Sequence, residues 1–301
     1  MIRYGIVVHG GAGSPLQFSD GCKAACEAAF ALLEAGLPAL DAVVEAARIL
    51  EDDGRFNAGC GSVLRLDGRT IEMDSGVMDS KNNVGMVMAI REVKNPVLVA
   101  RAILETPHVA LSGQGAAAFA RKKGFPPLHR VSERSLERFK ELRELIRKGK
   151  LGEQNPQWQG RDLESLWNFE DVPFGDLFRC DTIGAAAMDR EGDMAVATST
   201  GGASPMMLGR VGDSPLIGCG FYAGHACAVA VTGIGEEIIR RMLAKGVYDM
   251  VLSGDAVTAA CEKGIALFPA EIPAGVIGIS REGFCISSNR EMAGYALIRE
   301  D

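Results

Sequence analysis

The strongest constraint on the fold is a pair of short apolar segments in the second half of the chain. They span residues 182–188 and 194–198, and the turn Asp189–Arg190–Glu191–Gly192 separates them. Small and apolar side chains at almost every position predict strands that are buried in the core. Because only a short turn joins the two strands, we expect them to pair as antiparallel neighbours.

The rest of the chain continues this pattern of strands and short turns. Further strands are predicted at residues 6–8, 62–66, 70–73, 84–93, 226–231, 275–280 and 284–288, with Asp67–Gly68 as the hairpin turn between the second and third of these. Helices are predicted at residues 20–33, 38–51, 96–105, 115–121, 235–244 and 255–267, the first of them capped by Asp20. Consecutive strands with paired helices are typical of antiparallel sheets covered by helices rather than of βαβ units. The sequence therefore predicts one α+β domain over residues 1–301.

Composition argues against several classes of function. Hydrophobic residues make up 47% of the chain and charged residues 24%, as in soluble globular proteins. The net charge of −7 argues against a nucleic-acid partner, and no apolar run reaches the roughly 18 residues that span a membrane. Eight scattered cysteines predict buried, reduced thiols rather than zinc ligands or disulfides. With no signal peptide or glycosylation sequon, a cytoplasmic location is expected.

A charged region from residue 129 to 178 interrupts the regular elements. Both tryptophans of the chain, Trp158 and Trp167, lie in it. An amphipathic helix capped near Ser132 is predicted at its start, with Leu136, Phe139, Leu142, Leu145 and Ile146 on its apolar face. Residues 148–171 have no regular pattern, and an irregular segment of that length is usually functional or disordered. We therefore interpret residues 129–178 as a variable linker.

Thr182 opens the first apolar segment directly after Cys180 and Asp181. A threonine hydroxyl becomes a nucleophile only when a base lies beside it, and one source of that base is the threonine's own free α-amine. Cleavage of the peptide bond before Thr182 would supply that amine. The sequence thus raises the hypothesis of an N-terminal threonine nucleophile.

Two glycine-rich turns in the first half of the chain allow a functional and a structural interpretation. His9–Gly10–Gly11–Ala12–Gly13 follows a strand and could present backbone N–H groups to an oxyanion, although a tight turn with a packed histidine is also possible. The turn that carries Asn57 could contact substrate or be structural. The acidic run from Glu51 to Asp53 is interpreted as the solvated end of a helix.

Three motifs in the second half of the chain are equally open when taken singly. Arg210 and Asp213 lie three residues apart on a glycine-rich loop, where they could grip an amino acid or form a surface ion pair. Thr232 and Gly233 end a strand before a helix, so they could face an oxyanion or simply begin the helix. Thr200 belongs to a cluster of hydroxyl residues at a strand end, 18 residues after Thr182, and these hydroxyls could equally bond to nearby backbone.

The order and spacing of these motifs are more specific than any one of them. The chain contains, in sequence, HGGAG (9–13), LEDDGRFNAGCGS (50–62), IEMDSGVMD (71–79), NPVLVAR (95–101), DTIGAAAMD (181–189), TSTGG (198–202), GRVGDSP (209–215) and TGIGE (232–236). Over nearly its whole length the chain thereby resembles the plant-type L-asparaginase and isoaspartyl peptidase family of N-terminal nucleophile hydrolases. The resemblance implies a four-layer αββα sandwich.

The resemblance also implies roles for individual residues. The precursor would cut itself between Asp181 and Thr182 into an α chain, residues 1–181, and a β chain, residues 182–301. Thr182 would be the nucleophile and Thr200 its support. The remaining site residues fall into three groups: Thr232 and Gly233 in the oxyanion hole, Arg210, Asp213, Gly233 and Gly235 at the substrate, and Asn57 beside the active site.

The activity implied is release of L-aspartate from β-aspartyl peptides and L-asparagine, in a homodimer of αβ units and without a catalytic cofactor. A structural sodium ion would be bound by the backbone carbonyls of Leu50, Glu51, Asp53, Phe56, Ala58 and Cys60. Two alternatives remain open. Aspartate before the nucleophile is the pattern of the related glycosylasparaginases, and an unprocessed homologue could bind an amino acid through Arg210 and Asp213 without turnover.

Overall fold

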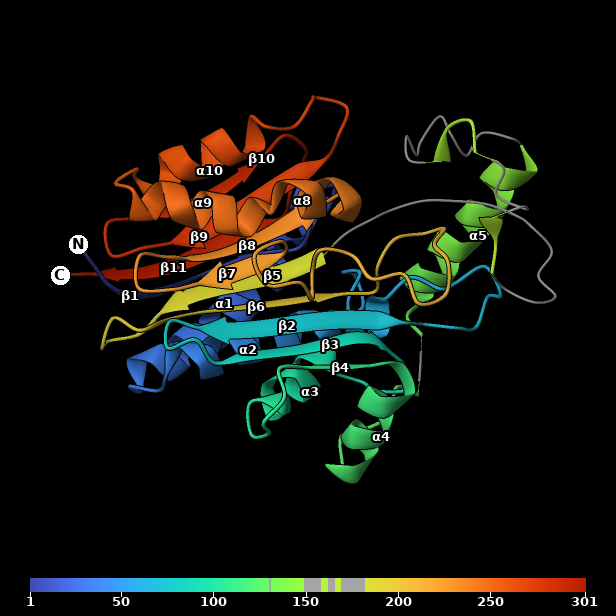
Figure 1. The fold of residues 1–301 in the computed structure, drawn as a ribbon, viewed down its shortest axis with the longest axis horizontal. Helices are drawn as coiled ribbons and strands as arrows, with labels where there is room; N and C mark the ends of the chain where they lie inside the picture. Colours follow the sequence, from blue (N-terminus) through green and yellow to red (C-terminus); the bar gives the residue numbers. More distant parts are fainter. Residues whose placement is uncertain (130, 149–157, 162–165, 169–181) are drawn as a thin grey trace.

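The computed structural model describes residues 1–129, 131–148, 158–161, 166–168 and 182–301. Two β-sheets face each other at the centre of the molecule, and helices cover the outer face of each sheet (Figure 1). The predicted four-layer αββα sandwich is therefore confirmed. The predicted cleavage position at Asp181 and most of residues 149–178 lie outside the described residues.

The larger sheet has seven strands in the order β11-β1-β5-β6-β2-β3-β4. Its strands are β1 (Ile2–His9), β2 (Met73–Asp79), β3 (Val84–Ile90), β4 (Ala110–Ser112), β5 (Thr182–Met188), β6 (Met194–Thr200) and β11 (Gly294–Glu300). All neighbours are antiparallel except β3 and β4. The apolar pair on which the sequence prediction rested, β5 and β6, forms the middle of this sheet.

The smaller sheet has four antiparallel strands in the order β10-β9-β8-β7. They are β7 (Phe221–Ala223), β8 (Ala228–Gly233), β9 (Ala274–Ile279) and β10 (Phe284–Ser288). The helices are α1 (Ser19–Glu34), α2 (Ala39–Asp53), α3 (Pro96–Ile103), α4 (Gly113–Lys122), α5 (Glu133–Arg147), α8 (Gly235–Arg241), α9 (Leu243–Leu252) and α10 (Val257–Ile265), with short 3-10 turns η1 (Leu16–Phe18) and η2 (Gly59–Gly61).

Successive side chains of the central strands point to opposite faces of the sheet, and both faces are covered, which explains why these strands are apolar at every position. In β5, Ala185 and Ala187 pack in the core beneath α1, α2 and α3, whereas Ala186 packs between the sheets. Phe221 and Ile277 of the smaller sheet lie on the opposite side of that inner layer. A third apolar cluster joins the smaller sheet to α9 and α10. Each central strand is thus covered on both faces, as its sequence predicts.

Several predicted elements were wrong in detail. Residues 62–66 and 70–73 do not form a hairpin of strands; Arg65 N–H donates to the Thr70 carbonyl at 2.8 Å, and a regular strand begins only at Met73. Asp20 does not cap α1, which begins at Ser19; its carboxylate pairs with Arg55. The helix predicted at 235–244 is interrupted at Met242, where φ is +46°, and α9 follows. Strands β4, β7 and β11 were not predicted.

The helix predicted after Ser132 is confirmed as α5, and the Ser132 hydroxyl accepts the N–H of Ser135 at 3.1 Å. Its apolar face is partly as predicted. Phe139, Leu145 and Ile146 pack against Leu66 together with both tryptophans, whereas Leu136 is exposed. The side chain of Leu142 lies outside the described part of the structure.

Candidate active site

The candidate nucleophile and its predicted support lie opposite each other at one end of the central strand pair. Thr182 is the first residue of β5 and Thr200 is the last residue of β6, and the two are direct partners in the antiparallel ladder. Both side chains are buried. The turn at residues 189–192 fixes this register, so the strand pairing itself brings the two hydroxyl-bearing residues together.

A small cavity lies beside this pair, and most of the predicted site residues line it. They are Thr182, Thr200, Arg210, Asp213, Gly233 and Gly235, joined by Gly202 and Ser214. The loop after β6 supplies Arg210 and Asp213, whereas β8 and the start of α8 supply the two glycines. Thr232 and Asn57 do not line the cavity. The structure thus gathers segments that are far apart in the sequence into one site.

Ser214 is a site residue that the sequence interpretation missed. Its hydroxyl lies 3.1 Å from Thr182 Oγ1, and its side chain is buried. The Ser214 carbonyl accepts a hydrogen bond of 2.6 Å from the Thr198 hydroxyl, which anchors this segment to β6. The only signal in the sequence was its place next to Asp213 in the GRVGDSP motif.

Thr232 is held in place by the glycine-rich turn near the N-terminus. The Ala12 N–H donates to Thr232 Oγ1 at 3.2 Å, across 220 residues of sequence. The Gly10 and Gly13 N–H groups donate to the carbonyls of Ala293 and Glu291. The turn is therefore a structural support for Thr232 rather than part of the cavity wall.

His9, at the start of the same turn, is fully buried. Its Nδ1 accepts the Gly11 N–H at 3.1 Å, and it lies opposite Gly184 in the ladder between β1 and β5. Burial lowers the pKa of His9 to about 3, against a smaller opposing effect of hydrogen bonding to the Thr182 backbone. The imidazole is therefore neutral at physiological pH, as a packed core histidine would be.

Arg210 and Asp213 are not the surface ion pair of the structural interpretation. Arg210 donates to Glu236 from Nε and Nη2, both at 2.9 Å. Asp213 is buried, and its Oδ2 accepts no hydrogen bond from the described residues. Burial raises the pKa of Asp213 to about 7, although Arg210 opposes the shift.

Gly235 lies where these two charged groups converge. A Cβ at this position would stand 2.8 Å from Arg210 Nη2 and 2.8 Å from Asp213 Oδ1. Only a glycine at the start of α8 leaves room for both side chains at the cavity. Arg210 also borders a larger cavity of about 570 Å³, with Met206, Met207 and Ile272 among its apolar walls.

Asn57 lies behind the cavity and connects two loops. Its side-chain Nδ2 donates to the Gly202 carbonyl at 2.7 Å, and its Oδ1 accepts the Val63 N–H at 2.9 Å. The Asn57 carbonyl accepts the N–H of Gly201 at 2.9 Å. These contacts fix the backbone that follows Thr200.

The acidic run at the end of α2 is not uniformly solvated, contrary to the prediction. Glu51 is fully buried; it accepts the Ser199 hydroxyl at 2.6 Å and the Val97 N–H at 3.1 Å. Burial raises the pKa of Glu51 to about 8, whereas these hydrogen bonds oppose the shift. Asp52 and Asp53 are partly exposed.

The loop after α2 has features that fit the predicted sodium ligands. The carbonyls of Glu51 and Phe56 approach Gly59 and Gly61 so closely that a Cβ at either glycine would collide with them. The Ala58 carbonyl accepts the Gly61 N–H and the Cys60 carbonyl accepts the Ser132 N–H, both at 3.0 Å, and each keeps a second lone pair. Oxygen lone pairs of this kind are the ligands that a hard cation takes.

Comparisons with known proteins agree with this site. The protein family described as asparaginase matches residues 2–300. A plant-type L-asparaginase of Pyrococcus horikoshii is 41% identical and is aligned over 98% of this chain and 96% of its own. An isoaspartyl peptidase/L-asparaginase of Macaca fascicularis and an isoaspartyl peptidase of Escherichia coli are each 36% identical, over 92% of this chain and 87% of theirs. No helix in the described residues is long and apolar enough to cross a membrane. The chain therefore belongs to the asparaginase family of N-terminal nucleophile hydrolases.

Proposed function

We propose that this protein cuts its own chain before Thr182 and then hydrolyses β-aspartyl peptides and L-asparagine to release L-aspartate. The observation that carries the proposal is the grouping of Thr182, Arg210 and Asp213 around one cavity. A nucleophile beside a cation and an anion is what an amide of aspartate requires. Its amide carbonyl is attacked while its α-carboxylate and α-ammonium are held.

Self-cleavage would begin with attack of Thr182 Oγ1 on the carbonyl carbon of Asp181. The peptide C–N bond breaks as the new ester C–O bond forms, and water then hydrolyses the ester. The products are chains of residues 1–181 and 182–301, and Thr182 gains a free α-amine. With a reference pKa of about 7.7–8.0, that amine is well placed to accept the hydroxyl proton near neutral pH.

Substrate binding would use the two charged groups of the cavity. The guanidinium of Arg210, oriented by Glu236, takes the α-carboxylate. Asp213 takes the α-ammonium, and its buried Oδ2, which accepts no hydrogen bond from the described residues, supports this assignment. The larger cavity next to Arg210 offers room for substrates longer than free asparagine.

In turnover, Thr182 would attack the side-chain carbonyl carbon of the bound aspartyl residue. Thr232 and Gly233 would stabilise the oxyanion; loss of one such donor costs roughly 10²–10³ in rate. The amine or ammonia leaves with a proton returned by the Thr182 amine, and water then hydrolyses the β-aspartyl ester. Thr200 and Ser214 would orient the nucleophile.

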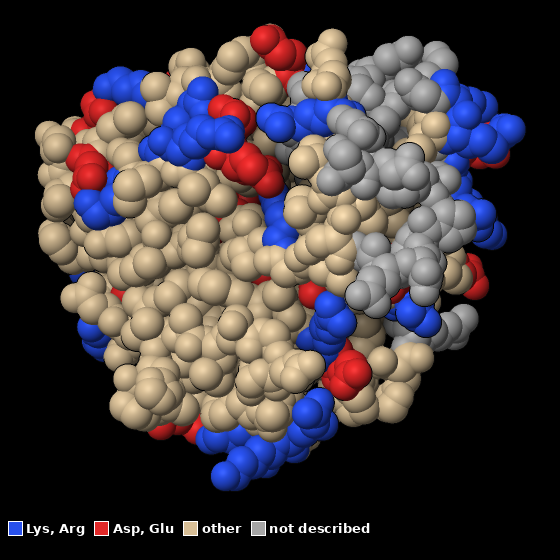
Figure 2. Space-filling model, turned by 45° about the vertical axis from the view of Figure 1, so that its right-hand side comes forward, with Lys and Arg blue, Asp and Glu red and all other residues tan. Residues whose placement is uncertain are grey.

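Three further features belong to the same proposal. A sodium ion held by carbonyls from Leu50 to Cys60 would stabilise the loop that carries Asn57, and no catalytic step passes through it. A homodimer of αβ units is supported by a broad surface without charged side chains, bordered by Lys, Arg, Asp and Glu (Figure 2). The cytoplasmic location expected from the sequence stays a prediction.

Mass spectrometry of the purified protein tests the cleavage. We expect two chains, with the second beginning at Thr182, and a single intact chain for Thr182→Ala. Release of aspartate from a β-aspartyl dipeptide, from L-asparagine and from aspartylglucosamine then ranks the substrates. An unbroken wild-type chain that releases no aspartate would contradict the proposal, and a preference for aspartylglucosamine would favour a glycosylasparaginase.

A further inference from the structure

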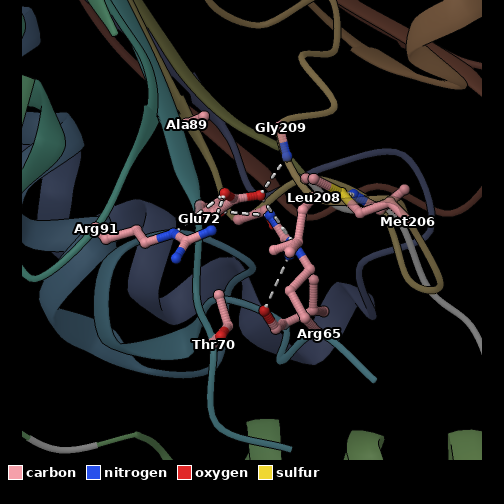
Figure 3. Close-up of polar contacts among 12 residues, drawn as sticks. Arg65, Thr70, Glu72, Ala89, Arg91, Met206, Leu208 and Gly209 are labelled. Carbon is pink, nitrogen blue, oxygen red and sulfur yellow. Dashed lines mark hydrogen bonds and ion pairs between the residues drawn. The ribbon is translucent and has the colours of Figure 1, made fainter. Parts of the chain in front are cut away.

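A buried ion pair lies directly behind the loop that carries Arg210. Glu72 immediately precedes β2 and is buried, and Arg65 is 1% exposed. The Nε of Arg65 lies 3.6 Å from Glu72 Oε2, and its Nη2 donates to the Glu72 carbonyl at 2.9 Å. Figure 3 shows both side chains pointing toward each other beneath the loop at Leu208 and Gly209.

The carboxylate of Glu72 reaches the backbone next to Arg210. Its Oε2 accepts the N–H of Gly209 at 2.9 Å, while its Oε1 accepts Nη2 of Arg91 at 2.7 Å (Figure 3). Arg91 is about half exposed, so its contact is the outer one of the two. The oxygen that faces Arg65 is therefore the one that holds the loop.

Arg65 connects the same pair to the nucleophile side of the site. Its Nη1 donates to the Gly201 carbonyl at 3.1 Å, one residue after Thr200. Burial lowers the pKa of Arg65 to about 10, opposed mainly by Glu72, so the guanidinium is still charged at neutral pH. The ion pair thus joins the strand end at Thr200 to the loop at Arg210.

Among the described residues, the loop at Gly209 has one other backbone contact: the Arg210 N–H donates to the Met207 carbonyl at 3.2 Å and closes a turn. Apart from its chain neighbours, no heavy atom of the described residues lies within 4 Å of where a Cβ of Gly209 would stand, and the φ of Gly209 is +76°. The neighbouring residue Leu208 exchanges two hydrogen bonds with the side chain of Asn168. The Glu72 carboxylate is thus a side-chain contact that ties this turn, next to Arg210, to the start of β2.

We propose that Glu72 is a positioning residue that, together with Arg65, fixes Arg210 for the α-carboxylate of the substrate. This inference rests on the proposed function. Glu72 is proposed to contact neither the substrate nor Thr182. Substitution of Glu72 should therefore weaken substrate binding without affecting the cleavage of the chain.

Two variants remove the contact in different ways. Glu72→Asp keeps the charge beside Arg65 but withdraws the carboxylate by one methylene from Gly209. The double variant Arg65→Met with Glu72→Met replaces the pair with apolar side chains of similar size, a change that buried ion pairs often tolerate. The matched control is Arg91→Met, which removes the outer partner of Glu72 and leaves Arg65 and Gly209 in place.

Steady-state kinetics with L-asparagine and a β-aspartyl dipeptide provide the test. Loss of a hydrogen bond to a charged group corresponds to roughly a ten- to hundredfold change in an equilibrium constant. We therefore expect KM to rise by about that factor in both variants. We expect kcat to change less than threefold and Arg91→Met to resemble the wild type. Self-cleavage, followed on denaturing gels, should be complete in all of them.

A double-mutant cycle with Arg210→Ala separates positioning from general damage. If Glu72 acts through Arg210, Glu72→Asp has no further effect on kcat/KM in the Arg210→Ala background. An unchanged KM, or an equal loss in both backgrounds, would overturn the inference. A wild-type chain that neither cleaves nor releases aspartate would instead refute the proposed function before any Glu72 variant is made.

Discussion

The buried carboxylate of Asp213 makes substrate binding dependent on pH in a defined direction. Burial raises its pKa to about 7, and its Oδ2 accepts no hydrogen bond among the described residues. Only the ionised carboxylate attracts the α-ammonium of the substrate. The α-amino group itself stays protonated below about pH 7.7, so Asp213 is the partner that titrates as the pH falls.

The size of the effect follows from this pKa. If only ionised Asp213 binds substrate, KM should rise about tenfold at pH 6 and about a hundredfold at pH 5, relative to its value for fully ionised Asp213 and protonated substrate amine. Protonation of the Thr182 amine would also slow turnover in acid, but it should lower kcat rather than raise KM. The two effects are therefore separable by measuring both constants.

The assay is ammonia release from L-asparagine between pH 5 and 8.5, compared with the variant Asp213→Asn. The variant should have a higher KM at pH 8, by roughly ten- to a hundredfold, and a KM that no longer depends on pH in the acid range. Calorimetry of L-aspartate binding near pH 6 should also detect proton release, because the bound ammonium lowers the pKa of Asp213. A wild-type KM that stays flat from pH 5 to 8, or an equal slope in Asp213→Asn, would refute this reasoning.

Three further predictions concern residues around the site. Ser214→Ala removes the hydroxyl 3.1 Å from Thr182 Oγ1, so kcat should fall about fivefold with KM nearly unchanged; a rise in KM alone would contradict this role. Gly235→Ala places a methyl group 2.8 Å from both Arg210 and Asp213, so KM should rise by about tenfold or more while gels still show complete self-cleavage. Burial raises the pKa of Glu51 from 4.5 to about 8, so its contribution to stability is fully present below about pH 4.5 and is lost as the pH rises through 8. In urea unfolding, Glu51→Gln should therefore lose less stability between pH 5 and 8 than the wild type, and an identical loss would count against this account.

The central hairpin could be predicted from the sequence because local rules determine it. The turn at residues 189–192 sets the register, and the register alone places Thr182 opposite Thr200. The apolar character of both strands then requires layers on each face, which is the sandwich observed. The same local reasoning failed at residues 62–73. There the buried side chain of Arg65 donates to backbone carbonyls, and no regular ladder forms.

The contacts that complete the site could not be predicted from local patterns. Ala12 and Thr232 are joined across 220 residues, and Glu72 and Gly209 across 137. Glu51 follows a helix pattern and precedes two other acidic residues, so its sequence context is that of a solvated helix end. In its buried position the Glu51 carboxylate accepts hydrogen bonds from Ser199 of β6 and Val97 of α3. Only tertiary structure distinguishes such a residue from its exposed neighbours.

The buried carboxylates near the site differ in what compensates their charge. Glu72 has Arg65 and Arg91 beside it, so its charge is balanced within the protein. Asp213 Oδ2 accepts no hydrogen bond from the described residues, and Arg210 donates from Nε and Nη2 to Glu236. Burial of an ionised group without a bonded partner is costly, and a ligand ammonium would remove that cost. The pair at Glu72 therefore holds the loop in place, whereas the buried Oδ2 of Asp213 makes binding selective for ligands that bring a positive charge.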